Sequence, residues 1–218
     1  MRFLGLLGSK KSSISSDQKS KTKSGEDHRS LPKKEIITHP PFGIFTDSRD
    51  GKRYKTIKIG KQIWMAENLA FQRYFGCRYY NNDLSIGAEY GFLYDWNTSR
   101  EACPPGWHIP TDAEWTALTD YLGGEGVAGG KMKEEGTTHW KSPNKGATNE
   151  SGFSALASGS FVFLVGFLNI DKNAIFWSSS MTDYQEAWAR ELYSDLEGVS
   201  RFCFSWNGCL SVRCIKNN

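Results

Sequence analysis

Residues 103–115 read Cys-Pro-Pro-Gly-Trp-His-Ile-Pro-Thr-Asp-Ala-Glu-Trp, and the prediction of the fold depends on this stretch. Its three prolines fix the backbone φ angle and remove three N–H donors, so the segment before Thr111 is expected to be stiff and non-helical. Thr111 and Glu114 have the spacing of a capping box, in which each side chain accepts a hydrogen bond from the other residue's backbone N–H. The stretch therefore predicts that a helix begins at Asp112.

The predicted helix covers Asp112–Leu122. Trp115 and Leu118 begin an apolar face at helical spacing. Gly123-Gly124 ends the helix, because glycine adopts the left-handed conformation at low cost. The glycine-rich segment Gly123–Gly130 is expected to be a flexible loop. A phosphate-binding loop is not indicated there, because no Lys-Ser or Lys-Thr pair follows.

The charge of the chain is unevenly distributed. The 218 residues hold 27 Lys and Arg and 24 Asp and Glu, a net charge of +3. Residues 1–40 hold nine Lys and Arg and four Asp and Glu. Residues 41–218 therefore hold 18 Lys and Arg and 20 Asp and Glu. The basic character therefore belongs to the first forty residues, and a basic nucleic-acid groove on the rest is not indicated.

The domain organisation follows from this contrast. Residues 1–40 are rich in Ser and Lys and lack periodicity, which predicts a disordered basic tail or linker, with a solvated spacer favoured over a membrane or nucleic-acid contact. Residues 41–218 hold all eight tryptophans and are expected to form one domain. No clear signal peptide is found at the start. The most apolar run, Phe161–Ile170, is too short for a transmembrane segment, which takes roughly 20 residues.

The cysteines and histidines do not indicate a metal centre. The five cysteines contain no C-x-x-C pair, and the four histidines are far apart in the sequence. No cofactor is expected. Two states of the cysteines are open: a Cys103–Cys214 disulfide in an exported protein, or reduced, buried thiols in a cytosolic one.

The remaining pattern predicts mostly short strands. Residues 54–59 and 62–65 alternate around a Gly60-Lys61 turn and are expected to pair as a hairpin, and Cys77–Tyr80 is a possible short strand. Further strands are expected at Gly152-Phe153, Phe161–Leu168, Ala174–Ser179, Ala187–Leu192, Val199–Phe204 and Leu210–Ile215. The second half should thus be a β-meander with few helices, within an α+β fold.

Several motifs, taken together and in order, identify a family resemblance. They are Asp50-Gly51-Lys52-Arg53-Tyr54, Gly60-Lys61-Gln62-Ile63-Trp64-Met65-Ala66-Glu67-Asn68-Leu69, Tyr90-Gly91-Phe92-Leu93-Tyr94, Cys103-Pro104-Pro105-Gly106-Trp107-His108-Ile109-Pro110-Thr111, Gly152-Phe153, Phe176-Trp177-Ser178-Ser179-Ser180 and Val212-Arg213-Cys214. Over roughly residues 47–216 the chain resembles the Fibrobacter succinogenes major paralogous domain. The resemblance departs from the family pattern around Ala157–Val165.

The resemblance implies several properties. It implies a C-type-lectin-like mixed fold with short antiparallel strands and one or two helices, related to formylglycine-generating enzymes. It favours the Cys103–Cys214 disulfide, which corresponds to the long disulfide of that fold. It also implies an extracellular or cell-surface location, although the sequence shows no clear export signal.

A second likeness points to a binding face. Variable proteins of diversity-generating retroelements use this fold, and the corresponding variable window here is roughly Met181–Ser211. Its mix of aromatic, Arg, Asp and Asn side chains is typical of a paratope. The candidate ligand-binding residues are Tyr184, Arg190, Tyr193, Asp195, Arg201, Phe202, Phe204, Trp206 and Asn207. The alternative is that these aromatic side chains pack the meander, since alternation turns half of them inward.

The leading hypothesis is a non-catalytic surface module that binds a protein or a glycan. One alternative is an enzyme related to formylglycine-generating oxidases, which would need a low-pKa thiol at Cys203 or Cys209. These two cysteines could instead form a hairpin disulfide, which is the favoured state, or be two variable positions. A purely structural module is the third reading. Calcium at Trp206-Asn207-Gly208 lacks support, because no acidic partner is present.

Overall fold

Helix α3 (Asp112–Tyr121) begins where the sequence predicts. The computed structural model describes residues 41–182 and 184–217, so the tail expected at residues 1–40 lies outside the described residues. The capping box is present: Glu114 N donates to Thr111 Oγ1 at 3.1 Å, and Thr111 N donates to Glu114 Oε2 at 2.8 Å. Trp115 is buried, and its indole N–H donates to the backbone oxygen of Trp177 at 3.1 Å. The helix is thus fixed to a strand of the second half.

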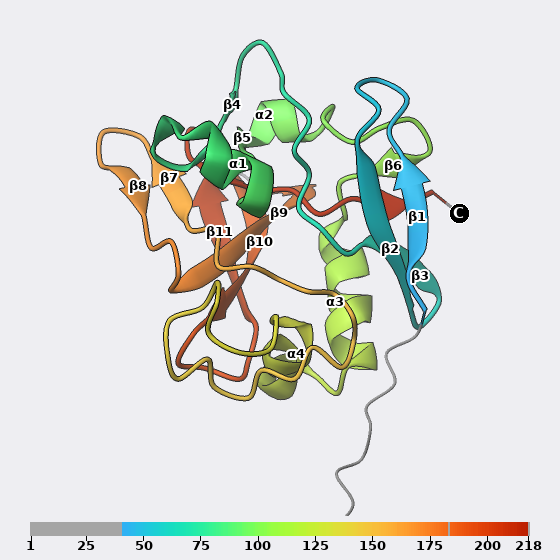
Figure 1. The fold of residues 1–218 in the computed structure, drawn as a ribbon. Helices are drawn as coiled ribbons and strands as arrows, with labels where there is room; N and C mark the ends of the chain where they lie inside the picture. Colours follow the sequence, from blue (N-terminus) through green and yellow to red (C-terminus); the bar gives the residue numbers. More distant parts are fainter. Residues whose placement is uncertain (1–40, 183, 218) are drawn as a thin grey trace, which may run out of the picture. The chain divides into compact units, whose positions relative to one another are not determined.

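One sheet has five strands and carries the predicted hairpin. In spatial order its strands are β1 (Gly43–Thr46), β2 (Arg53–Ile59), β3 (Gln62–Met65), β13 (Ile215–Lys216) and β6 (Trp107–His108). β2 and β3 pair antiparallel around the Gly60-Lys61 turn, which confirms the hairpin. The C-terminal β13 lies between β3 and β6, so this sheet joins both ends of the described chain (Figure 1).

The second sheet has eight strands and holds the C-terminal meander. Its main path runs through β11 (Ser200–Ser205), β10 (Glu186–Tyr193), β9 (Asn173–Met181), β12 (Cys209–Ser211), β5 (Leu93–Asp95) and β4 (Cys77–Arg78), with β7 (Ser160–Val162) beside β12 and β8 (Gly166–Leu168) beside β7. β9, β10 and β11 form the predicted antiparallel meander. Among the strands of the described residues, β11 pairs only with β10, and it is an edge strand of this sheet.

Helices are more numerous than the one or two expected. Besides α3, the described part of the chain holds α1 (Leu84–Tyr90), α2 (Trp96–Ser99), α4 (Glu125–Met132) and the short 3₁₀ helix η1 (Tyr80–Asn82). Strands still predominate, and the helices and sheets are intermixed along the chain (Figure 1). The arrangement is compatible with the predicted α+β class.

Helix α4 corrects the prediction of a flexible glycine-rich loop. Gly129 and Gly130 lie in this helix and are buried. A Cβ at Gly129 would collide with the backbone of Gly198, and one at Gly130 with the backbone of Gly146. The glycines therefore allow two loops to approach the helix closely, which is a packing role rather than a flexible one.

Three predicted strands also need correction. Phe161–Leu168 is not one buried strand but the β7–β8 hairpin, because the chain turns at Leu164 and Gly166, both with positive φ. Leu210–Ile215 is divided between β12 and β13, which belong to different sheets. Gly152-Phe153 is not a strand: Gly152 N donates to Asn149 O in a turn, and Phe153 packs in the core.

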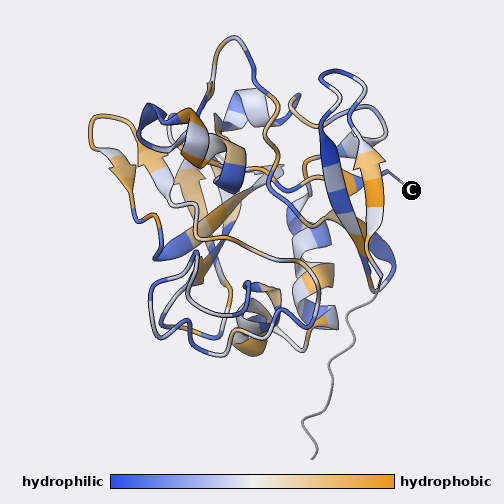
Figure 2. Cartoon of the chain, viewed as in Figure 1, coloured by the Kyte–Doolittle hydropathy of each residue, from blue (hydrophilic) through white to orange (hydrophobic). Residues whose placement is uncertain are grey.

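Two aromatic clusters fill the interior. In the first, Trp64, Trp115, Phe153 and Phe176 are buried and have ring centroids 4.9–5.9 Å apart in the contacting pairs. The second cluster lies on the other side of β9 and includes Trp177. Hydropathy alternates along β2 in Figure 2, as expected for a strand with one face on this interior.

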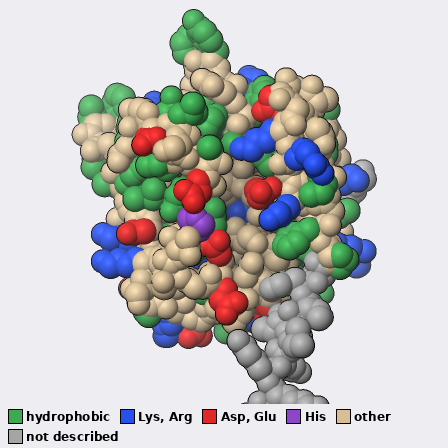
Figure 3. Space-filling view, viewed as in Figure 1, with side chains coloured by type: hydrophobic (Ala, Val, Ile, Leu, Met, Phe, Trp, Pro, Cys, Tyr) green, Lys and Arg blue, Asp and Glu red, His purple; other side chains and the backbone are tan. Residues whose placement is uncertain are grey.

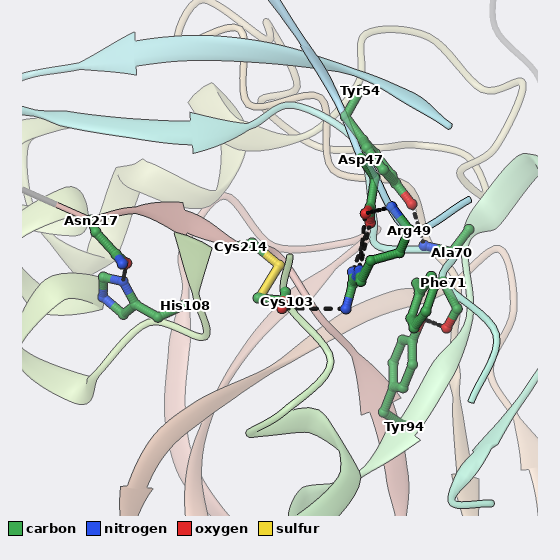
Figure 4. Close-up of a disulfide and its surroundings, with 10 residues drawn as sticks. All are labelled: Asp47, Arg49, Tyr54, Ala70, Phe71, Tyr94, Cys103, His108, Cys214 and Asn217. Atoms are coloured by element: carbon green, nitrogen blue, oxygen red, sulfur yellow. Dashed lines mark hydrogen bonds and ion pairs between the residues drawn. A yellow bond between two sulfur atoms is a disulfide. The ribbon is translucent and has the colours of Figure 1, made fainter. Parts of the chain in front are cut away.

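The Cys103–Cys214 disulfide is present and joins the proline-rich lead-in to the segment before β13. Its Cα atoms are 6.0 Å apart, within the normal range. Beside it, Arg49 Nη1 donates to Cys103 O at 3.4 Å and Arg49 Nη2 pairs with Asp47 at 2.7 Å (Figure 4). The Arg49 guanidinium also lies 3.7 Å from the centroid of the Phe71 ring. The disulfide and these contacts fix the lead-in against the β1–β2 turn.

We expect the double variant Cys103→Ser/Cys214→Ser to be less stable than the wild type by roughly 4–5 kcal/mol. The physical reason is the sequence separation of 111 residues, because a bridge over so long a loop removes much conformational entropy from the unfolded chain. Urea unfolding of the oxidised wild type and of the double variant measures the difference. Equal unfolding free energies would show that the disulfide does not stabilise the fold.

Candidate functional site

The structure divides the nine predicted ligand-binding residues among three places. Arg190, Arg201, Phe202 and Phe204 lie within β10 and β11. Tyr184, Trp206 and Asn207 lie in the loops beyond one end of these strands, and Tyr193 and Asp195 lie at the other end. β10 has eight residues, so its two ends are roughly 25 Å apart at about 3.3 Å per residue. A small ligand could contact one of these places but not all three.

Arg201 is an exposed side chain that contacts both an aromatic ring and a carboxylate. Its guanidinium lies 3.3 Å from the centroid of the Trp188 ring on the adjacent strand. Arg201 Nε and Nη2 donate to the carboxylate of Asp112 at 3.0 and 2.9 Å. The side chain is nevertheless 35% exposed. A fixed, half-exposed arginine on an aromatic ring is typical of the residues that dominate binding interfaces.

Arg190 shares the Asp112 carboxylate but faces inward. Its side chain is fully buried, and its Nη1 donates to Asp112 Oδ1 at 2.8 Å. Its Nη2 donates to Thr116 Oγ1 at 3.2 Å. This arginine connects β10 to α3 and offers no surface to a ligand in this conformation.

Asp112 therefore holds a charged centre between the helix and the strands. Burial raises the pKa of this carboxyl, but hydrogen bonds from Arg201 and Arg190 lower it by more, and the net pKa lies below the ordinary value of 3.8. Its position at the N-terminus of α3 is also favourable for a negative charge. Asp112 thus remains ionised at any physiological pH and keeps Arg201 in place.

Phe202 and Phe204 combine packing and exposure. They lie on the opposite face of β11 from Arg201, across from Ala189 and Ala187 of β10. Both alanines are fully buried beneath the rings, and Phe204 packs edge-on against Trp177 at 5.7 Å. Each phenylalanine remains half-buried. The packing interpretation and the binding interpretation thus both describe these rings in part.

The loops at one end of β10 and β11 lie side by side. Trp206 N donates to Gln185 O at 3.1 Å, next to the 85%-exposed Tyr184. The Trp206 ring stacks on buried Trp96 with centroids 4.6 Å apart and an interplanar angle of 11°. Asn207 is exposed. Tyr184 and Asn207 are therefore accessible, whereas Trp206 is anchored by stacking.

The opposite end of β10 borders a polar hollow of about 350 Å³. Tyr193 and the exposed Asp195 lie in its wall. The Tyr193 hydroxyl donates to buried Glu191 at 2.6 Å, and Asn173 Nδ2 donates to the same carboxylate at 2.5 Å. Burial raises the pKa of Glu191 although both hydrogen bonds lower it. Tyr193 is thus held by Glu191 and also lines the hollow.

The thiols correct the expected Cys203–Cys209 hairpin disulfide. Both cysteines are free, and so is Cys77. Cys203 lies opposite Trp188 on the edge strand β11, whereas Cys209 lies in β12 opposite Asp95. The two strands do not pair, so the cysteines are not positioned as cross-strand partners.

Neither of these two thiols has the low pKa that a nucleophile requires. Burial raises the pKa of Cys209 to about 11. Burial, and then the charge of Glu186, raise the pKa of Cys203. Within residues 41–182 and 184–217 no group of three His, Cys, Asp or Glu side chains could hold a metal ion.

Sequence reasoning missed two residues of the site, Trp188 and Asp112. Trp188 lies in the Met181–Ser211 window but is not among the nine candidates, and its ring supports Arg201. Asp112 is predicted only as the start of a helix, and nothing local in the sequence indicates that β10 and β11 each direct an arginine to it. A correct register for β10 and β11 would have shown that Arg190 and Arg201 are direct cross-strand partners and so lie on the same face.

No helix in the described ranges combines the length and apolarity needed to cross a membrane.

The comparisons with known proteins give one match. The family model described as the Fibrobacter succinogenes major domain matches residues 57–216, nearly three quarters of the chain. Neither the search of curated proteins nor the search of solved structures gives a match.

We expect three reactive thiols when the oxidised protein is unfolded without reductant, and five after reduction. The three are Cys77, Cys203 and Cys209, because only Cys103 and Cys214 are bonded. Alkylation in denaturant followed by mass spectrometry counts them. A single reactive thiol would show that Cys203 and Cys209, or another pair, form a second bridge.

Proposed function

We propose that this chain, which belongs to the Fibrobacter succinogenes major domain family, is a non-catalytic module that binds a protein or glycan ligand. The proposed contact surface, here called the Arg201 surface, comprises Trp188, Arg201, Cys203 and Ser205 on one face of β10 and β11. The exposed Tyr184 and Asn207 lie in the adjoining loops. We further propose that the domain has a C-type-lectin-like fold and acts at the cell surface.

The observation that carries the proposal is the fixed geometry of Arg201. A free arginine loses rotamer entropy when it binds a ligand, but here Asp112 and Trp188 already restrain the side chain. Nε and Nη2 donate to Asp112 and the side chain remains 35% exposed, so Nη1 is the donor that we propose for a ligand oxygen. A pre-oriented donor beside an aromatic ring suits the hydroxyls and carboxylates of a glycan or of a protein surface.

The alternative of a formylglycine-type oxidase finds less support. Such an enzyme would need a reactive pair of cysteines, but Cys203 and Cys209 are free, lie on unpaired strands and have raised pKa values. A purely structural module would not require an exposed arginine fixed in this way. The binding module therefore remains the function that the geometry favours.

We expect Arg201→Ala to weaken binding by about tenfold or more while the fold is kept. Folding should survive because Asp112 retains its buried partner Arg190 at 2.8 Å. The measurement is an array of glycans and purified cell-surface proteins, probed with the full chain, followed by titration of any ligand found. Arg53→Ala is the matched control, because Arg53 is exposed on the other sheet. Identical array profiles for wild type and Arg201→Ala would contradict the proposal.

We also propose that a retroelement diversifies this surface, which the DNA beside the gene can test. We expect a reverse-transcriptase gene and a near-copy of the Met181–Ser211 coding stretch that differs mainly at adenines. The structure restricts where the differences should fall. Exposed positions such as Tyr184, Arg201 and Asn207 should differ, whereas Ala187, Ala189, Arg190 and Leu192 are fully buried and should not. Without a reverse-transcriptase gene nearby, the retroelement proposal would be abandoned.

A further inference from the structure

Two loop tips of the domain expose large apolar side chains. In the β3–β4 loop, Tyr74 and Phe75 are 92% and 78% exposed. At the tip of the β7–β8 hairpin, Phe163, Leu164 and Val165 are 62%, 91% and 65% exposed. Hydrophobic side chains stand out from the body over both segments, at the top and at the upper left of Figure 3. The cartoon coloured by hydropathy shows the β7–β8 hairpin as strongly apolar (Figure 2).

Both tips project from the same end of the eight-stranded sheet. β4 pairs antiparallel with β5, β5 with β12, and β12 with β7. Three antiparallel steps make β4 and β7 antiparallel to each other, so the start of β4 and the end of β7 lie at one end. The Tyr74-Phe75 tip comes before β4, and the Phe163–Val165 tip follows β7 (Figure 1). The strand directions thus place both tips at the same end of the sheet.

The conformation of Leu164 indicates that its apolar side chain is not required by the fold. Leu164 has a φ of +67°, in the left-handed region that Asn and Gly adopt far more readily than Leu. Its side chain is almost entirely exposed, so packing does not compensate for this conformation. A polar turn residue would suit both the backbone and the solvent better. The exposed leucine is thus explained better by an external contact than by stability.

A polar hollow lies beneath the aromatic tip. It has a volume of about 540 Å³, and its lining includes Arg73, Asn97 and Thr98 as well as the two aromatic residues. Arg73 contacts Glu101 at 3.4 Å, but the Glu101 side chain is 77% exposed, so this ion pair is weak. The arginine thus remains available to a phosphate group next to the rings.

We propose that the two tips insert into the interface of a lipid bilayer, with Arg73 at the level of the headgroup phosphates. The tips stand out from the body of the domain, a shape suited to penetrating a soft interface (Figure 3). Tyr and Phe side chains are suited to the boundary between headgroups and acyl chains. This inference is independent of the Arg201 surface, which lies on other strands.

The test uses sedimentation of the full chain with neutral phosphatidylcholine vesicles in high salt. Salt screens any attraction of the basic residues 1–40 to the vesicles but leaves apolar insertion intact. We expect the wild type to sediment with the vesicles. Leu164→Asn and Phe75→Ser should each reduce the partition coefficient by about tenfold. Leu164→Asn should keep or raise the melting temperature, because Asn tolerates the left-handed conformation.

A matched control separates the tips from general hydrophobicity. Ile44 is 54% exposed on β1 of the five-stranded sheet, which carries neither tip, and Ile44→Asn should sediment like the wild type. The proposal is overturned if the wild type stays in the supernatant, or if Leu164→Asn binds the vesicles as well as the wild type does. It is also overturned if the wild type is a dimer that Leu164→Asn dissociates without any vesicle binding, since the tips would then contact a second copy.

Discussion

The fold depends on the burial of one positive charge, that of Arg213. Its side chain is fully buried, and Nε and Nη2 donate to Asn68 Oδ1 at 3.1 and 2.8 Å. The same guanidinium donates to the backbone oxygens of Met65 and Phe153 and lies 4.3 Å from the centroid of the Phe153 ring. A buried charge is tolerated only when such donors are satisfied. The segments that contain Met65 and Asn68, Phe153, and Arg213 itself must therefore come together. Burial lowers the pKa of Arg213 to about 9, which still leaves it charged at neutral pH.

This constraint explains how residues 212–214 connect the two sheets. Val212 O accepts from Leu69 N and Cys214 O accepts from Met65 N, both at 2.9 Å, so the backbone on either side of Arg213 is paired as well. Cys214 then forms the disulfide with Cys103, and the next residue enters β13. Side-chain, backbone and covalent contacts thus coincide within three residues. Each of the three residues contacts a part of the chain that is distant in sequence.

The sequence predicted the local structure better than the long-range structure. The capping box at Thr111 and Glu114 and the hairpin around Gly60-Lys61 depend on neighbouring residues, and both are present. The helix α4 was missed because its glycines are explained only by the loops that pack on them. The β7–β8 turn was missed because it uses Leu164 where a turn signal would be Asn or Gly. For the site, the aromatic and arginine positions could be proposed, but their division among three places, and the role of Asp112, depend on the tertiary fold.

The carboxylate that Arg190 and Arg201 share on Asp112 explains how Arg201 can be held in place and yet be substituted without loss of the fold. Arg190 alone satisfies Asp112 from the interior and joins β10 to α3. Arg201 binds the same carboxylate from outside. If Arg201 is lost, Asp112 and Arg190 still pair with each other, and every buried charge keeps its partner. Loss of Arg190 would be different, because Arg201 approaches from solvent and cannot fill the interior space. The fold therefore depends on the inner arginine, whereas replacement of the outer one leaves the scaffold intact, as the proposed role of the Arg201 surface requires.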